Sequence, residues 1–226
     1  MLAIIKKELK SYFYTPIGYV FIAIFLSVVS LIFYTYTFSS GYLNFEYIIW
    51  DSTIVLAFIT PVLTMRMFAE ERKTGTDQLL FTSPKSIIGI VLGKFLAATL
   101  VVIIGLLFTF IYYGILRHFG EVSLREPLVA MFGYILLAMS YISFGMFASS
   151  ITESQIIAAV IPIAFSFITS FLQNYQGIAS MFSLISMYQK FPQGIISLKE
   201  VVGYITFILL FTTLTIIVLQ RRKSVK

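Results

Sequence analysis

Few residues in this sequence have side chains that could catalyse a reaction or hold a metal ion. The 226 residues include 10 Asp and Glu, one His and no Cys. The absence of cysteine excludes disulfides, thiol catalysis and thiolate metal sites. The one histidine, His118, follows Arg117 in a polar stretch, which is typical of a solvated loop residue. We therefore expect no catalytic residues, no metal site and no cofactor bound by this chain.

The main polar break in the front half of the chain lies at 68–84, between two long apolar runs. Thr76 suits the N-cap of a short helix, and Pro84 ends that helix because proline disfavours helical geometry at Ser83. We expect a loop on one membrane face that holds a short amphipathic helix. Its charged residues are Glu70, Glu71, Arg72, Lys73 and Asp77, and its apolar cluster is Leu79, Leu80 and Phe81.

Two acidic positions could indicate other functions. Glu70 and Glu71 suggest the E-E-x-x-x-R motif of intramembrane proteases, but the spacing to Arg72 is wrong and no histidine lies in a second helix. A charged junction at the membrane edge is the better interpretation. Asp51 lies near an apolar run, where a carboxylate is a candidate ion site. Its nearness to Glu46 favours a position at the outer interface instead.

The polar break carries a family resemblance. The string E-E-R-K-T-G-T-D-Q-L-L-F-T-S-P, followed by I-I-G-I-V-L-G-K at 87–94, resembles the first cytoplasmic loop of ABC-2-type exporter permeases. Those proteins read like E-R-E-x-G-T-x-x-x-L-L-x-T-P, followed by a helix with a G-K pair. Lys73 replaces the acidic residue of that pattern. The matching residues are Glu71, Arg72, Gly75, Thr76, Leu79, Leu80, Pro84, Gly93 and Lys94.

The composition requires a membrane around these residues. The chain is 59% hydrophobic and 12% charged, against about 25% charged in soluble domains. Long apolar runs without alternation indicate helices rather than a barrel. We expect an all-α polytopic protein, with one transmembrane permease domain over 1–226. Its six transmembrane helices would lie near 17–38, 47–67, 87–113, 127–149, 155–172 and 201–220.

Three further segments would complete this fold. Residues 2–14, with Lys6, Lys7 and Lys10 opposite an apolar side, suit a helix in the membrane interface within residues 1–16. The mixed segment 173–200 is either a re-entrant helical hairpin, as in similar exporters, or a partly buried loop helix. The third span carries small residues that would let helices pack closely, Gly89, Gly93 and Ala97.

The distribution of Lys and Arg gives the expected orientation. Twelve lie on the side that holds both termini and the 68–86 loop, and four lie on the other side: Arg117, Arg125, Lys190 and Lys199. By the positive-inside rule the first side is the cytoplasm, so the chain would be a multi-pass protein of the cytoplasmic (inner) membrane. The net charge of +6 follows from these membrane edges and does not indicate nucleic-acid binding.

The resemblance implies the permease subunit of an ATP-driven exporter, similar to permeases linked to gliding motility or copper-enzyme maturation. It implies two copies of a separate ABC ATPase that bind ATP and Mg, because this chain has no P-loop motif. A second permease, identical or a paralogue, would pair through the first and fifth spans within membrane lipid. The substrate would be a peptide or another amphiphile. The residues expected to couple to the ATPase are Glu70, Glu71, Arg72, Gly75, Thr76, Asp77, Leu79, Leu80, Phe81 and Pro84.

The alternative is an ion-coupled secondary transporter or channel without an ATPase. It would need charged groups or broken helices near the middle of the bilayer. Asp51 is the one acidic residue that supports it.

Overall fold

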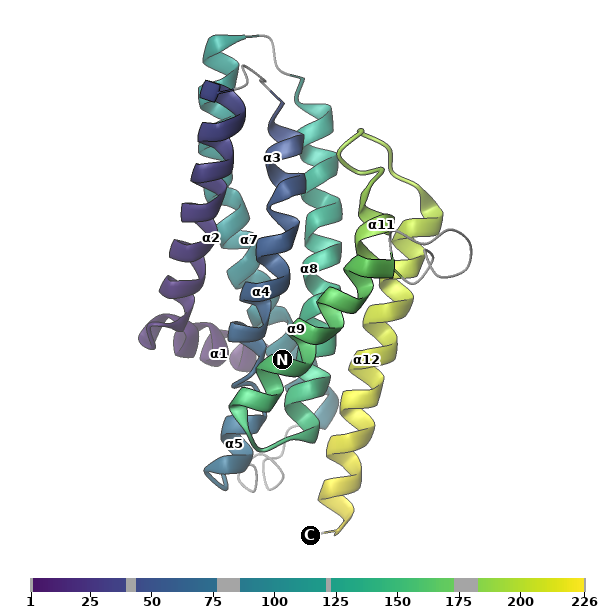
Figure 1. Cartoon of the computed structure of the whole chain (residues 1–226). Coiled ribbons are helices and arrows are strands. Elements are labelled where there is room, and N and C mark those ends of the chain that lie inside the picture. The colour runs from purple at the N-terminus through teal and green to yellow at the C-terminus, as the bar shows by residue number, and fades with distance from the viewer. Residues whose placement is uncertain (1, 40–43, 77–85, 121–122, 173–182, 226) are drawn as a thin grey trace.

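The computed structural model describes residues 2–39, 44–76, 86–120, 123–172 and 183–225, and this part of the chain contains helices and no strand (Figure 1). Two short helices, α3 (Phe45–Asp51) and α4 (Thr53–Thr64), follow each other with a break at Ser52. The helices are α1 (Leu2–Tyr14), α2 (Ile17–Tyr34) with the π-helix η1 (Thr35–Ser39), α3 (Phe45–Asp51), α4 (Thr53–Thr64), α5 (Ala69–Lys73), α7 (Ile87–Phe119), α8 (Arg125–Ile151), α9 (Gln155–Leu172), α11 (Leu184–Tyr188) and α12 (Leu198–Val225).

Six helical stretches of the described chain are long and apolar enough to cross a membrane. They begin at Ile17, Thr53, Ile87, Arg125, Gln155 and Leu198, which confirms the predicted all-helical fold with six spans. The third and the sixth are longer than predicted, and α12, which holds the sixth, has 28 residues. Helix α7 continues to Phe119 and has 33 residues, so it is about 50 Å long and exceeds a hydrocarbon core of about 30 Å.

Helix α8 is the centre of the bundle and packs against α4, α7, α9 and α12. Close contact with α4 depends on Gly145, where an added Cβ would lie 2.3 Å from Thr64 Oγ1. Helices α2, α9 and α12 keep many large apolar side chains exposed, which suits contact with lipid.

The described part of the 173–200 segment begins at Ser183 and contains α11. The hydroxyl of Tyr188 donates to the carbonyl of Ala130 at 3.0 Å, and its ring stacks on Trp50 with centroids 5.5 Å apart. Helix α11 is therefore a buried short helix held against α8. Residues 173–182 lie outside the described part of the chain.

Figure 1 shows α1 lying across the end of α2, with α5 farther toward the same end of the bundle. The last turn of α12 lies at this end as well. The N-terminal helix, the start of the polar 68–86 segment and the basic C-terminal turn therefore share one end of the molecule.

Candidate functional site

The polar segment after the second span is described as far as Thr76. It turns at Met65–Phe68 and forms the short helix α5, which ends at Lys73 and is followed by Gly75 with a φ of 71°. This left-handed conformation favours glycine, because other residues have a Cβ clash there. Of the predicted coupling residues, Asp77, Leu79, Leu80, Phe81 and Pro84 lie outside the described residues.

Ser149 near the end of α8 fixes the start of α5. Its Oγ accepts the backbone N–H groups of Phe68 and Ala69 at 3.1 and 3.0 Å. The same hydroxyl donates to the carbonyl of Met65 at 3.2 Å. One buried serine thus satisfies backbone groups that the turn would otherwise leave unpaired, and it ties the polar segment to the central helix.

Lys94 of α7 is the centre of the charged site. Its side chain is only 3% exposed, and its Nζ lies 2.7 Å from Glu71 Oε1 and 3.3 Å from Glu8 Oε1. The ammonium also lies 5.3 Å from the centre of the Phe68 ring, within cation–π range. A buried lysine is tolerated where carboxylates compensate its charge. This lysine therefore joins α1, α5 and α7.

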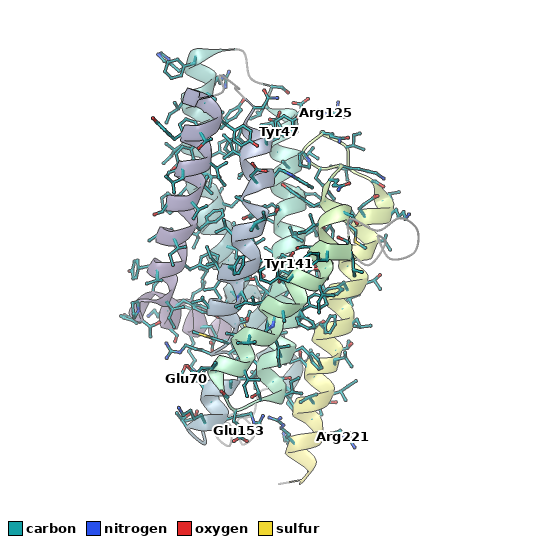
Figure 2. The ribbon with its side chains drawn as sticks, in the orientation of Figure 1. Tyr47, Glu70, Arg125, Tyr141, Glu153 and Arg221 are labelled. Carbon is teal, nitrogen blue, oxygen red and sulfur yellow. The ribbon has the colours of Figure 1, made fainter. Side chains whose placement is uncertain are left out.

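Two more ion pairs surround this centre. Arg66 forms a two-bond pair with Glu70, one turn further along the segment. Arg72 pairs with Glu153, in the turn between α8 and α9. Figure 2 shows Glu70 and Glu153 at the same end of the bundle as the basic residue Arg221. The sequence-predicted residues Glu70, Glu71 and Arg72 thus each bind a different part of the protein.

Helix α1 is attached to the same site by its inward side. Ile4 lies against Gly93, where an added Cβ would be 2.7 Å from Ile4 Cγ2. The hydroxyl of Tyr12 donates to the carbonyl of Leu63 at 3.0 Å, and burial raises the pKa of this phenol. The helix is therefore packed against protein along its length.

A half-open polar cavity of about 300 Å³ lies between α1 and the polar segment. Basic and acidic side chains and hydroxyl groups line it, among them Lys7, Glu8, Arg66, Glu70, Glu71 and Lys94. The three basic and three acidic residues balance in formal charge, which suits a contact with a polar partner better than binding of a lone ion. Among the described residues, no group of three or more His, Cys, Asp or Glu side chains could hold a metal ion.

The predicted small residues of α7 have different surroundings. Gly93 faces α1, and Ala97 is fully buried. Gly89 is half-exposed, and an added Cβ there would meet only Ser86 Oγ at 3.1 Å, within its own helix end. Within this chain, only the inner two positions serve close packing between helices.

Asp51 lies away from this site, at the end of α3. It is half-buried, and its Oδ2 accepts the hydroxyl of Tyr36 at 2.6 Å. This contact joins η1 to the break between α3 and α4. The Asp51 carboxylate therefore has a hydrogen-bond partner within the protein, which indicates a structural role.

Sequence reasoning missed four residues of the charged site, which were not singled out as polar partners: Glu8, Arg66, Ser149 and Glu153. Lys94 was noted only as part of a G-K pair. A lysine seven residues into an apolar helix is a signal that it needs a buried acidic partner, although the sequence does not say which one.

The comparisons with known proteins agree with this architecture. No curated protein sequence matches the chain. The family described as ABC-2 family transporter protein matches residues 35–220, about four fifths of the chain, from the end of α2 to near the end of α12. The chain therefore belongs to the ABC-2 transporter family, as the multi-pass membrane permease of an ABC transporter.

Proposed function

We propose that this permease exports its substrate with energy from a separate ABC ATPase that docks on the polar segment 68–86. ATP and Mg bind to that partner, since the sequence of this chain has no P-loop. The observation that carries the proposal is the buried pairing of Lys94 with Glu71 and Glu8. An exposed segment needs a buried ionic connection to the membrane helices only if its position relative to those helices must be kept fixed.

Each contact of α5 gives a route for force. Glu71 connects α5 to α7 through Lys94, and Arg72 connects it to the turn before α9 through Glu153. The Ser149 hydroxyl connects it to α8. A displacement of α5 by the ATPase would therefore move three spans together. Tightly packed elements shift between discrete arrangements rather than deform continuously, which suits alternating access.

We propose a complex of two ATPases and two permeases, the second permease being either this chain or a paralogue. The exposed apolar faces of α2 and α9, for example at Leu31 and Ile168, support pairing through the first and fifth spans. We place the protein in the cytoplasmic (inner) membrane with both termini and α5 in the cytoplasm. Twelve of the 16 Lys and Arg residues lie on that side in our assignment.

The substrate we propose is a peptide or another amphiphile. A mainly apolar groove of about 150 Å³ between α4 and α9 supports this class. Phe58 and Phe167 line it and meet edge to face at 5.2 Å, while Ser166 and Ser170 add polar groups. Transport of candidate amphiphiles into vesicles that contain both subunits tests this choice.

Charge reversal tests the coupling role. Glu71→Lys faces Lys94 with a like charge, so ATP hydrolysis should continue while transport per ATP falls at least tenfold. The swap Glu71→Lys with Lys94→Glu restores opposite charges and should recover part of the transport. Lys199→Glu is the control, because Lys199 is exposed, lies outside the polar segment and pairs with no described residue. Normal coupling in an assembled Glu71→Lys complex would refute the role.

A polar substitution of Leu80 tests the docking helix itself, and Leu80→Gln should weaken co-purification with the ATPase. The orientation has a separate test. The chain has no cysteine, so Thr76→Cys provides a unique label site. An impermeant thiol reagent should label it only after the cells are opened. Labelling on intact cells would place the segment outside and exclude ATP-driven coupling through it.

A further inference from the structure

Helix α1 has two opposite lines of side chains, each with four-residue spacing. The inward line is Ile4, Glu8 and Tyr12, which contact Gly93, Lys94 and Leu63 respectively. This line uses the helix's only acidic residue for an internal ion pair. The outward line is Leu2, Lys6, Lys10 and Tyr14, which we call the outer ridge.

The outer ridge is free on the described structure. Leu2 and Tyr14 are each 83% exposed, and Lys6 and Lys10 between them are also exposed. Neither lysine has a hydrogen bond or an ion pair with any residue that the structure describes. The ridge therefore has two adjacent unpaired cations, with an apolar residue at one end and an aromatic residue at the other.

The position of the ridge brings it to a membrane surface. A turn at Thr15 and Pro16 joins α1 directly to α2, the first span, so α1 lies where that span leaves the hydrocarbon. In Figure 1, α5 lies farther out than α1 at this end of the bundle, so a soluble partner approaching the end would meet α5 first. A helix that joins the end of a span in this way would lie at the level of the lipid headgroups.

The chemistry of the ridge matches phospholipid. Lysine stems can lie along apolar surface while their ammonium groups reach phosphates, and tyrosine favours the interface. Ile5, Leu9 and Phe13 flank the ridge and are half-buried, so they extend its apolar border. With Glu8 turned inward to Lys94, no acidic side chain of α1 offsets Lys6 and Lys10.

We propose that the outer ridge of α1 binds the headgroups of anionic phospholipids in the leaflet that it borders. In this arrangement the inward line of α1 contacts protein, and the outer ridge contacts anionic lipid. This role does not depend on the ATPase, so it stands or falls separately from the proposed transport function.

The first test measures lipid binding to the full-length purified chain in dodecyl maltoside, with fluorescent phosphatidylglycerol as the probe. Each lysine near an anionic surface contributes a factor of about five, so Lys6→Gln with Lys10→Gln should weaken binding on the order of thirtyfold. The control, Lys73→Gln with Lys199→Gln, removes the same charge from two other exposed positions and should change affinity less than twofold. Equal losses in both variants, or equal binding of fluorescent phosphatidylcholine by the wild type, would overturn the proposal.

The second test locates the ridge. Single cysteines at Leu2 and Tyr14 carry a fluorophore in vesicles with lipids spin-labelled near the headgroup, and both should be quenched strongly. A cysteine at the exposed Thr74 of the polar segment is the control and should be quenched weakly. If the Lys6 and Lys10 variant instead loses co-purification with the ATPase and keeps its lipid affinity, the ridge binds protein and the proposal is wrong.

Discussion

Replacement of Lys94 by methionine is the sharpest test of the charged site. The substitution keeps most of the side-chain volume and removes the ammonium that two carboxylates share. Glu71 and Glu8 are only 19% and 13% exposed, so each would become a largely buried carboxylate without its cation. Breaking a buried ion pair in this way costs about 3–5 kcal/mol of unfolding free energy.

A chain of this length loses about 2–4 °C of melting temperature per kcal/mol, so Lys94→Met should melt about 6–20 °C below the wild type. The assay is thermal unfolding of the purified protein in detergent, followed by intrinsic fluorescence. Lys73→Met removes an exposed lysine nearby and should shift the melting temperature by less than about 2 °C. If the two variants have the same melting temperature, the Lys94 ion pairs do not stabilise the site.

A triple variant separates stability from coupling. Glu8→Gln, Glu71→Gln and Lys94→Met together leave no unpaired charge, and such neutral replacements are often close to the wild type in stability. The triple variant should therefore regain most of the melting temperature. Its transport per ATP should remain low, because α5 then has no ionic connection to α7. Full recovery of transport would contradict a mechanical role for the ion pairs.

Three further predictions concern neighbouring contacts. Gly93→Ala should destabilise the protein by about 1–3 kcal/mol, because the added Cβ would lie 2.7 Å from Ile4 Cγ2. In a melting assay, the double variant Gly93→Ala with Ile4→Ala should recover part of this loss, because the clashing side chain is then shortened. Ser149→Ala should cost about 1–2 kcal/mol and speed amide exchange in α5, while exchange in α11 stays unchanged. Asp51→Asn should leave ATP-driven transport near the wild-type rate, because Asp51 only accepts the hydroxyl of Tyr36. Loss of transport in this variant, together with uncoupler-sensitive transport by the wild type, would support ion coupling instead.

The spans could be predicted from sequence because hydrocarbon imposes a length and a polarity on every crossing helix. The predicted fifth span, 155–172, has the same bounds as α9, since the sequence is polar immediately before it, at 152–154, and immediately after it, at Gln173 and Asn174. The extra length of α7 was not predicted, because residues 114–119 are no longer uniformly apolar and yet continue the helix. Polarity marks the membrane edge but does not by itself end a helix.

The charged site was predictable only in part. Glu70, Glu71 and Arg72 stood out because they interrupt an apolar sequence. Arg66, the partner of Glu70, lies at the i,i+4 spacing of a helix and could have been inferred. The partners of Glu71 and Arg72 are Lys94 and Glu153, which lie 23 and 81 residues away in other helices or turns. Periodicity within one helix carries no information on such pairs.

The length of α7 has a mechanical consequence. Lys94 lies near one end of this helix, and Phe119 ends it 25 residues later, about 37 Å away along the axis. If the helix stays straight and pivots at Lys94, a tilt of about 5° carries its far end sideways by about 3 Å, given that rise per residue. The helix would thus act as a lever arm, turning a small rotation at the charged end into a shift comparable to the radius of a side chain at the opposite membrane surface.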